Sequence, residues 1–242
     1  CYLEIIQNPE LSQKIAKKVI RQNPDDLEIY ACYSNNFMGY VNTYQITQRI
    51  NEYRVKGVVK KTSTEKIYTL PGTKKRVVLM DFGAKKSIAK ELQKRGCEVT
   101  VVPCDTGAKD IINLRPDGIM LSNGPGDPKE NIDIIKEIKK LYDTDIPIFA
   151  ICLGHQLMAL ATGADTYKLK YGHRGGNHPV KDLETGRTYI SSQNHGYAVD
   201  ESTLDNNVCV PAFINVNDST NEGLRYINKN IFTVQYHPEA SP

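Results

Sequence analysis

Hydrophobic and polar positions divide the chain at about residue 75 into parts with different periodicities. From Arg76 onward, short continuous runs of apolar residues alternate with stretches in which apolar residues recur every three or four positions. The continuous runs predict strands buried on both faces, at residues 76–81, 98–102, 118–122 and 147–151. The periodic stretches predict helices, at residues 84–95, 108–114, 131–142 and 154–161. Strands that alternate with helices imply βαβ units and a mostly parallel sheet.

The patterning is different at both ends of the chain. Beyond Thr166 the helical period is lost, and short strands in a more antiparallel arrangement are expected at residues 187–193, 208–216, 223–228 and 231–236. Near the start, apolar spacing indicates an amphipathic helix, at Leu11, Ile15 and Val19. A polar, Tyr-rich stretch and a β-like connector to Leu70 follow, and Pro71 and Gly72 are typical of a boundary.

These patterns predict an α/β chain of two parts. Residues 74–242 are expected to form a mostly parallel open sheet flanked by helices, with a more antiparallel C-terminal part. Residues 1–73 are expected to be a piece of a second domain and its linker. The chain begins at Cys1 rather than Met and stops abruptly at Pro242, so we interpret it as a fragment of a longer protein.

Composition and charge exclude several classes of protein. Of the 242 residues, 40% are hydrophobic and 24% are charged, which is typical of a globular protein and not of a disordered one. Lys and Arg number 31 against 28 Asp and Glu, and this net charge of +3 provides no extended basic surface for nucleic acid or anionic lipid. The most apolar window, residues 146–161, is interrupted by proline, glycine and histidine and is not expected to span a membrane.

The six cysteines show no metal-binding pattern. None belongs to a C-x-x-C pair, and no histidine cluster has the spacing of metal ligands, so we expect no metal. The even count leaves three disulfides open as an alternative. However, the chain is long enough to build its own core and carries no secretory signal. We therefore expect a soluble, cytoplasmic protein with reduced thiols.

One cysteine lies where a nucleophile would be held. Cys152 falls between the strand that ends at Ile151 and the helix that begins near Gly154, which is the position of the reactive residue in a nucleophile elbow. Such a turn needs small neighbours, and both Ala150 and Gly154 are small. The helix dipole is expected to favour the thiolate and to lower the pKa of Cys152 below its free value of about 8.5. A buried structural cysteine is the alternative interpretation.

Two further motifs favour catalysis. His237 and Glu239 follow the apolar run that ends at Val234, so both side chains could project into one cleft at a strand end. A thiol nucleophile needs a base to take and return its proton, and a carboxylate to orient that base. The glycines of Asn123–Pro128, directly after another strand, would let backbone amides approach a developing oxyanion. Each motif taken alone is also compatible with an ordinary loop.

With these motifs the sequence resembles the class I, triad-type glutamine amidotransferases from about Arg76 to its end. Within this family it is similar to the small, glutamine-hydrolysing subunits of carbamoyl-phosphate synthases, on the strength of three stretches, Asp81–Lys85, Gly172–Lys181 and Ser192–Asp200. The resemblance implies that Cys152, His237 and Glu239 form a catalytic triad. This triad would hydrolyse glutamine to glutamate and ammonia through a cysteine thioester.

The resemblance also implies substrate-binding residues and a partner. The backbone N–H groups of Leu153 and Gly124 would form the oxyanion hole. Further positions match those that hold glutamine, at Gly126, Gln156, Asn194, Gly196 and Tyr197. The ammonia would pass to a large synthetase subunit, which binds ATP, magnesium and bicarbonate, so no cofactor is expected in this chain. The product, carbamoyl phosphate, would serve pyrimidine and arginine biosynthesis.

The chain departs from the family in two respects. Position 150 is Ala where the family usually has Gly, and residues 1–73 match only a remnant of the small subunit's N-terminal domain and its linker, ahead of an amidotransferase domain at 74–242. We therefore expect the chain alone to be a poor glutaminase. Other interpretations stay open: another triad glutamine amidotransferase, a γ-glutamyl hydrolase, or a non-catalytic amidotransferase-like module. The remaining histidines are expected to have structural or interface roles, at His155, His173, His178 and His195.

Overall fold

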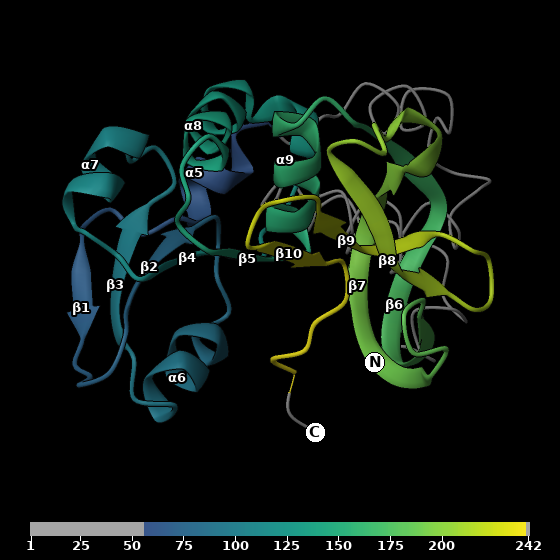
Figure 1. Ribbon diagram of the computed structural model, residues 1–242, viewed down its shortest axis with the longest axis horizontal. Coiled ribbons are helices and arrows are strands. Elements are labelled where there is room, and N and C mark those ends of the chain that lie inside the picture. Colours follow the sequence, from purple (N-terminus) through teal and green to yellow (C-terminus); the bar gives the residue numbers. More distant parts are fainter. Residues whose placement is uncertain (1–55, 241–242) are drawn as a thin grey trace, which may run out of the picture. The chain divides into compact units, whose positions relative to one another are not determined.

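A ten-stranded mixed sheet runs through residues 56–240, the part of the chain that this computed structural model describes (Figure 1). From one edge to the other its strands are ordered β1-β3-β2-β4-β5-β10-β9-β8-β6-β7. The strands are β1 (Tyr68–Leu70), β2 (Arg76–Asp81), β3 (Glu98–Pro103), β4 (Gly118–Leu121), β5 (Ile148–Ile151), β6 (Asp165–Asp182), β7 (Thr188–Asp200), β8 (Cys209–Asn215), β9 (Asn221–Tyr226) and β10 (Ile231–Val234). The helices are α5 (Val58–Thr62), α6 (Lys86–Lys94), α7 (Ala108–Asn113), α8 (Ile132–Tyr142) and α9 (Leu153–Ala161), with short 3₁₀ helices η1 (Pro128–Glu130) and η2 (Glu201–Thr203).

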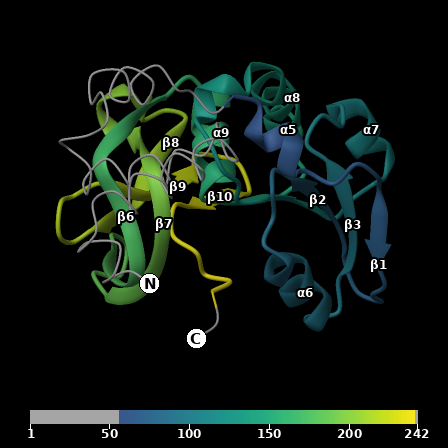
Figure 2. The ribbon, with the colours of Figure 1, turned by 180° about the vertical axis from the view of Figure 1, so that it is seen from behind.

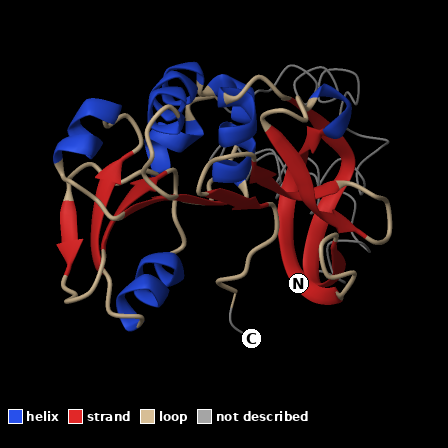
Figure 3. Ribbon diagram, viewed as in Figure 1, coloured by secondary structure: helices blue, strands red, loops and turns tan. Residues whose placement is uncertain are grey.

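One half of the sheet is parallel and lies between two layers of helices (Figure 3). β3, β2, β4, β5 and β10 run in one direction, and β1 is antiparallel to β3 at the edge. α6 covers one face, while α5, α7, α8 and α9 cover the other (Figure 1). On β2, Val78 and Met80 enter the core beneath α8 and α9, whereas Leu79 packs with α6 on the opposite face. The predicted α/β fold with a mostly parallel sheet is confirmed.

The helices form where the sequence presents an apolar face to the sheet. α8 buries Ile134, Ile138 and Leu141, which recur every three or four residues. α9 is buried on nearly all sides, its polar residues His155 and Gln156 included. It contacts α8 and the sheet strands β5, β10, β6 and β7, so it has no face left for solvent.

Four antiparallel strands extend the sheet beyond β10. β6 and β7 form a long curved hairpin (Figure 2), which β8 and β9 connect to β10. The strands expected at residues 187–193, 208–216 and 223–228 correspond to β7, β8 and β9. β6 was not expected, because its glycines and its mostly exposed side chains give it no alternation of apolar and polar positions.

The position of β10 corrects one expectation. The sequence places residues 231–236 in the more antiparallel part, but β10 pairs in parallel with β5, Ile231 lying beside Ile148. Its other edge pairs antiparallel with β9. β10 therefore joins the two halves of the sheet. A short apolar run shows that a strand is buried, but it does not show which strands lie beside it.

The segment ahead of β2 packs on the sheet. The chain from Lys56 onward groups as one compact unit. Within it, Val59 of α5 enters the core and Tyr68 of β1 lies beside Val101 of β3. The boundary near residue 73 stays a prediction, and the amphipathic helix indicated by Leu11, Ile15 and Val19 lies outside the described residues. None of the helices within residues 56–240 is both long and apolar enough to cross a membrane.

The turn between β1 and β2 leaves no room for a side chain at Gly72. A Cβ atom there would lie 2.1 Å from the carbonyl carbon and oxygen of Cys97 and 2.3 Å from the amide nitrogen of Glu98. We expect Gly72→Ala to lower the free energy of unfolding by roughly 1–3 kcal/mol, because the backbone at the start of β3 must move. Thermal unfolding of the full chain measures this loss.

Gly118→Ala is the matched control for this substitution. A Cβ at Gly118 would lie 3.6 Å from the Pro147 carbonyl oxygen, which is an ordinary van der Waals contact. We expect it to change the free energy of unfolding by less than about 0.5 kcal/mol. Equal losses in the two variants would show that the tight turn at Gly72 is not a constraint on the fold.

Candidate active site

The carboxyl ends of four parallel strands, β2, β4, β5 and β10, meet at one edge of the sheet, where open α/β sheets bind ligands. A cavity of about 450 Å³ lies there. Its walls are formed by the loops after these four strands, by the first turn of α9, and by residues of α5, β6 and β7. The cavity is therefore lined by residues that are far apart in the sequence, from Thr62 to His237.

Cys152 occupies the sharp turn from β5 into α9. Its backbone has φ 53° and ψ −104°, a conformation that non-glycine residues seldom adopt. The Cys152 N–H donates to Val234 O on β10 at 2.8 Å, and the Gly154 N–H donates to Ser122 O after β4 at 3.0 Å. A Cβ atom at Gly154 would lie 2.5 Å from Leu121 O, so a side chain does not fit. The turn has the geometry of a nucleophile elbow.

Burial determines the protonation state of the Cys152 thiol. The residue is 4% exposed, and desolvation raises the pKa of its thiol to about 12, although the Leu153 N–H favours the thiolate. The first turn of the helix does lower this pKa, as expected, but burial raises it by more, so the expected value below about 8.5 is wrong. The cost of burying the charged sulfur exceeds its favourable interaction with the helix N-terminus. Cys152 is a neutral thiol until a base takes its proton.

His237 and Glu239, which follow β10, form a buried pair. His237 Nδ1 lies 2.7 Å from Glu239 Oε1. A carboxylate accepts hydrogen bonds, so Nδ1 carries the proton and Nε2 carries the lone pair. That Nε2 is buried and has no hydrogen-bond partner among the described residues. His237 lines the same cavity as Cys152, so a free basic nitrogen and a thiol share one site.

Lys85 adds a positive charge beside Glu239. Its Nζ lies 3.5 Å from Glu239 Oε1. Burial raises the pKa of the Glu239 carboxyl, but the hydrogen bond from His237 and the charge of Lys85 outweigh burial and hold the pKa below its usual value. Glu239 is therefore ionised at neutral pH and can hold the imidazole in one orientation.

Of the two residues expected to supply an oxyanion hole, Gly124 lies on the loop after β4 and Leu153 is the first residue of α9. Gly124 lines the cavity, and a Cβ atom there would lie 2.2 Å from Phe82 O and 2.7 Å from Leu153 Cδ2. Leu153 lies behind the cavity wall, and its N–H interacts with the Cys152 sulfur. The glycine thus allows the loop after β4 to approach the elbow closely.

The other residues expected to bind glutamine also line the cavity: Gly126, Gln156, Asn194, Gly196 and Tyr197. The side chain of Gln156 connects α9 to β7 and to the end of β10 by hydrogen bonds. Its Nε2 lies 2.8 Å from Tyr197 O on β7 and 2.8 Å from Gln235 Oε1 at the end of β10. The side chain of Gln156 is therefore fixed before any ligand binds.

Several residues that line the cavity have no catalytic or substrate-binding role assigned from the sequence: Thr62, Lys85, Arg174 and His195. Lys85, Arg174 and His195 lie within the three stretches that carry the family resemblance, so a signal for them is present in the sequence. Thr62 ends α5, a five-residue helix too short to show a period. Burial lowers the pKa of His195 to about 4, so its imidazole is neutral at pH 7.

Solved structures share this fold. A GMP synthase-type protein from Thermoplasma acidophilum superposes with a TM-score of 0.60 at 23% identity, covering 68% of this chain and 84% of that one. A glutamine amidotransferase from Thermotoga maritima gives a TM-score of 0.55 at 17% identity, covering 68% of this chain and 76% of that one. At these identities the likeness concerns the fold alone.

Sequence comparisons identify closer relatives. The carbamoyl phosphate synthase small chain of Oceanobacillus iheyensis is 58% identical over 184 residues, and that of Listeria monocytogenes is 53% identical over 184 residues. Each match covers 76% of this chain and 50% of the relative, so the chain spans about half the length of the curated relatives it matches. The family model described as glutamine amidotransferase class-I matches residues 78–242. The chain therefore belongs to the class-I glutamine amidotransferase family.

Proposed function

We propose that the whole protein hydrolyses glutamine to glutamate and ammonia and supplies the ammonia for carbamoyl phosphate synthesis. The observation that carries the proposal is the placement of Cys152 on a strained elbow, in a cavity that His237 also lines while Glu239 holds His237. The family model, described as glutamine amidotransferase class-I, supports this substrate, and the relatives named carbamoyl phosphate synthase small chain support this product.

In the first half of the proposed reaction, the Cys152 sulfur bonds to the carboxamide carbon of the glutamine side chain. His237 Nε2 accepts the thiol proton as this bond forms, and Glu239 stabilises the imidazolium through Nδ1. The tetrahedral intermediate then collapses, and the proton passes from His237 to the leaving nitrogen. That nitrogen departs as ammonia and leaves a γ-glutamyl thioester on Cys152.

In the second half, water attacks the thioester carbon and His237 takes its proton. Collapse of this second intermediate returns the proton to the sulfur and releases glutamate. In both halves the N–H groups of Leu153 and Gly124 donate to the developing oxyanion. A preorganised donor of this kind is worth about 3–4 kcal/mol of the activation barrier. The glutamine itself is held by the cavity wall, at Gly126, Gln156, Asn194, Gly196 and Tyr197.

We propose that a large synthetase subunit is the partner that receives the ammonia. The relatives are small chains of a synthase, which implies a second component. The chemistry of ATP, magnesium and bicarbonate belongs to that partner in this proposal, and the present chain contributes the glutaminase site. We place the reaction in the cytoplasm, because the four cysteines of the described residues are free thiols, Cys97, Cys104, Cys152 and Cys209.

We expect Cys152→Ala to lower kcat for glutamine hydrolysis by at least about 10³-fold, because the covalent intermediate is lost. Release of glutamate by the full-length protein that contains this chain, alone and with a large synthetase subunit, measures the effect. Cys97→Ala is the control, since Cys97 is a half-buried thiol outside the cavity. Activity that persists in Cys152→Ala excludes the mechanism. A chain whose activity no synthetase subunit stimulates would instead favour another amidotransferase or a γ-glutamyl hydrolase.

We expect Glu239→Gln to lower kcat by about 10²- to 10⁴-fold with little change in KM for glutamine. The neutral amide cannot stabilise the imidazolium at His237, whereas the cavity wall that binds glutamine is unchanged. The exposed Glu130 provides the control variant Glu130→Gln, which should retain full activity. A rise in KM at constant kcat would place Glu239 in substrate binding instead.

We expect alkylation of Cys152 by iodoacetamide in the free protein to accelerate by roughly tenfold per pH unit between about pH 7 and pH 10, without a plateau. The raised pKa, about 12, keeps the thiolate a minor species over this range. Mass spectrometry of the peptide that contains Cys152 measures the rate. A plateau near pH 8 would mean that the dipole of α9 outweighs burial.

A further inference from the structure

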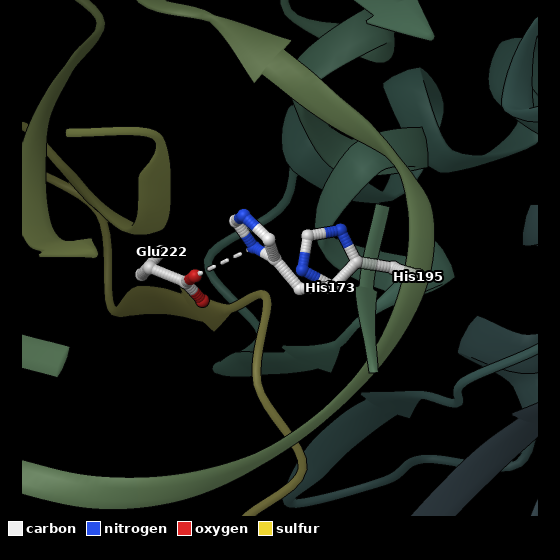
Figure 4. A group of neighbouring side chains, drawn as sticks. All are labelled: His173, His195 and Glu222. Atoms are coloured by element: carbon white, nitrogen blue, oxygen red, sulfur yellow. Dashed lines mark ion pairs between the residues drawn. The ribbon is translucent and has the colours of Figure 1, made fainter. Parts of the chain in front are cut away.

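Two histidines and a glutamate from three strands meet beside the cavity (Figure 4). His173 lies on β6, His195 lies opposite it on β7, and Glu222 lies on β9. One candidate ligand atom of each residue lies within 4.8 Å of the other two. The three residues are 9%, 6% and 0% exposed, respectively. Buried polar groups need partners, so each atom that faces the centre of this cluster requires an explanation.

Each imidazole is held from outside the cluster. His173 Nε2 lies 2.7 Å from Asp218 Oδ2, and His195 Nδ1 lies 2.8 Å from Tyr197 O. Both oxygens accept hydrogen bonds, so these two nitrogens carry protons, and in a neutral ring the other nitrogen carries a lone pair. Glu222 and Asp218 raise the pKa of His173, so a metal ion would have to displace a proton from its Nδ1. Those other nitrogens, His173 Nδ1 and His195 Nε2, are buried without a hydrogen-bond partner among the described residues. Histidines that bind metals are oriented in this way by an outer acceptor.

Glu222 brings negative charge to the same point. Its buried carboxylate accepts hydrogen bonds from Gln193 Nε2 at 2.7 Å and from Asn215 Nδ2 at 3.0 Å, which fix its orientation. Both donors are neutral amides. His173 Nδ1 lies 3.5 Å from Glu222 Oε1, longer than a normal hydrogen bond (Figure 4). A carboxylate buried this deeply is stabilised by a cation beside it.

We propose that His173, His195 and Glu222 bind a divalent transition metal ion, with zinc as the best match. Two imidazole nitrogens and one carboxylate oxygen are a common ligand set for zinc, which is usually four-coordinate. Calcium and magnesium prefer oxygen ligands alone. Water would complete the coordination. The alternative to a metal ion at this site is a proton on His173 Nδ1, which would pair with the Glu222 carboxylate.

The proposed site differs from the expectation, drawn from the sequence, that the chain holds no metal. The three ligands are far apart in the sequence, and only the pairing of β6 with β7 and β8, and of β8 with β9, brings them together. A metal ion there would tie the β6–β7 hairpin to β9. His195 also lines the cavity, and its neighbours Asn194 and Gly196 form part of the same wall. The ion would therefore fix the position of this wall.

Zinc titration of the full chain, first freed of metal by a chelator, tests the proposal. We expect one zinc ion per chain. His195→Gln and Glu222→Gln each remove a ligand and should weaken zinc binding by at least about 100-fold. Asp218→Asn should weaken it by about tenfold, as is typical for a residue that orients a ligand. Because the Asp218 side chain is 43% exposed, this third variant leaves the core intact.

His178→Asn is the matched control. Its ring lies 5.3 Å from that of His173 but outside the three ligands, so zinc affinity should not change. Cobalt(II) in place of zinc should show tetrahedral d–d bands without thiolate charge transfer, which excludes binding at cysteines. Thermal unfolding in chelator checks that each variant is folded. The proposal is overturned if the folded wild type binds no zinc, the result expected for a shared proton, or if all variants bind it equally.

Discussion

The close approach of β4, β5 and β10 at their carboxyl ends constrains every other feature of the active site. Gly154 lies against the backbone of Leu121 with no space for a Cβ atom. The backbone N–H of Cys152 donates a hydrogen bond to the carbonyl oxygen of Val234. Together these contacts restrict the backbone conformation of the turn from β5 into α9, and they hold Cys152 at a positive φ despite the strain. The position of the sulfur is therefore set by the register of the central strands.

The same packing determines which groups beside the cavity are charged. Excluding water from the elbow makes the thiolate costly, whereas Glu239 keeps its charge because His237 and Lys85 compensate for burial. The cavity therefore contains Cys152 as a thiol and a histidine whose orientation Glu239 fixes. In the proposed reaction, His237 must therefore take the proton of Cys152 for the sulfur to attack.

Most of the parallel half could be predicted from the sequence, because β2 to β5 are continuous apolar runs and the helices between them are amphipathic. Cys152, His237 and Glu239 could be singled out because each follows such a run. β6 and the partners of β10 could not be predicted, since a glycine-rich exposed strand shows no period and a short run does not specify its neighbours. The expected pKa of Cys152 was wrong because local sequence does not reveal depth of burial. The cluster of His173, His195 and Glu222 exists only through strand pairing.

β10 lies in the middle of the sheet although it follows every other described strand in the sequence. While a ribosome is producing residues 1–230, β5 and β9 therefore each keep an unpaired edge, and the two halves of the sheet cannot join. His237 is also still absent at that stage. Synthesis of residues 231–237 therefore supplies both the strand that joins the two halves of the sheet and the histidine that follows it.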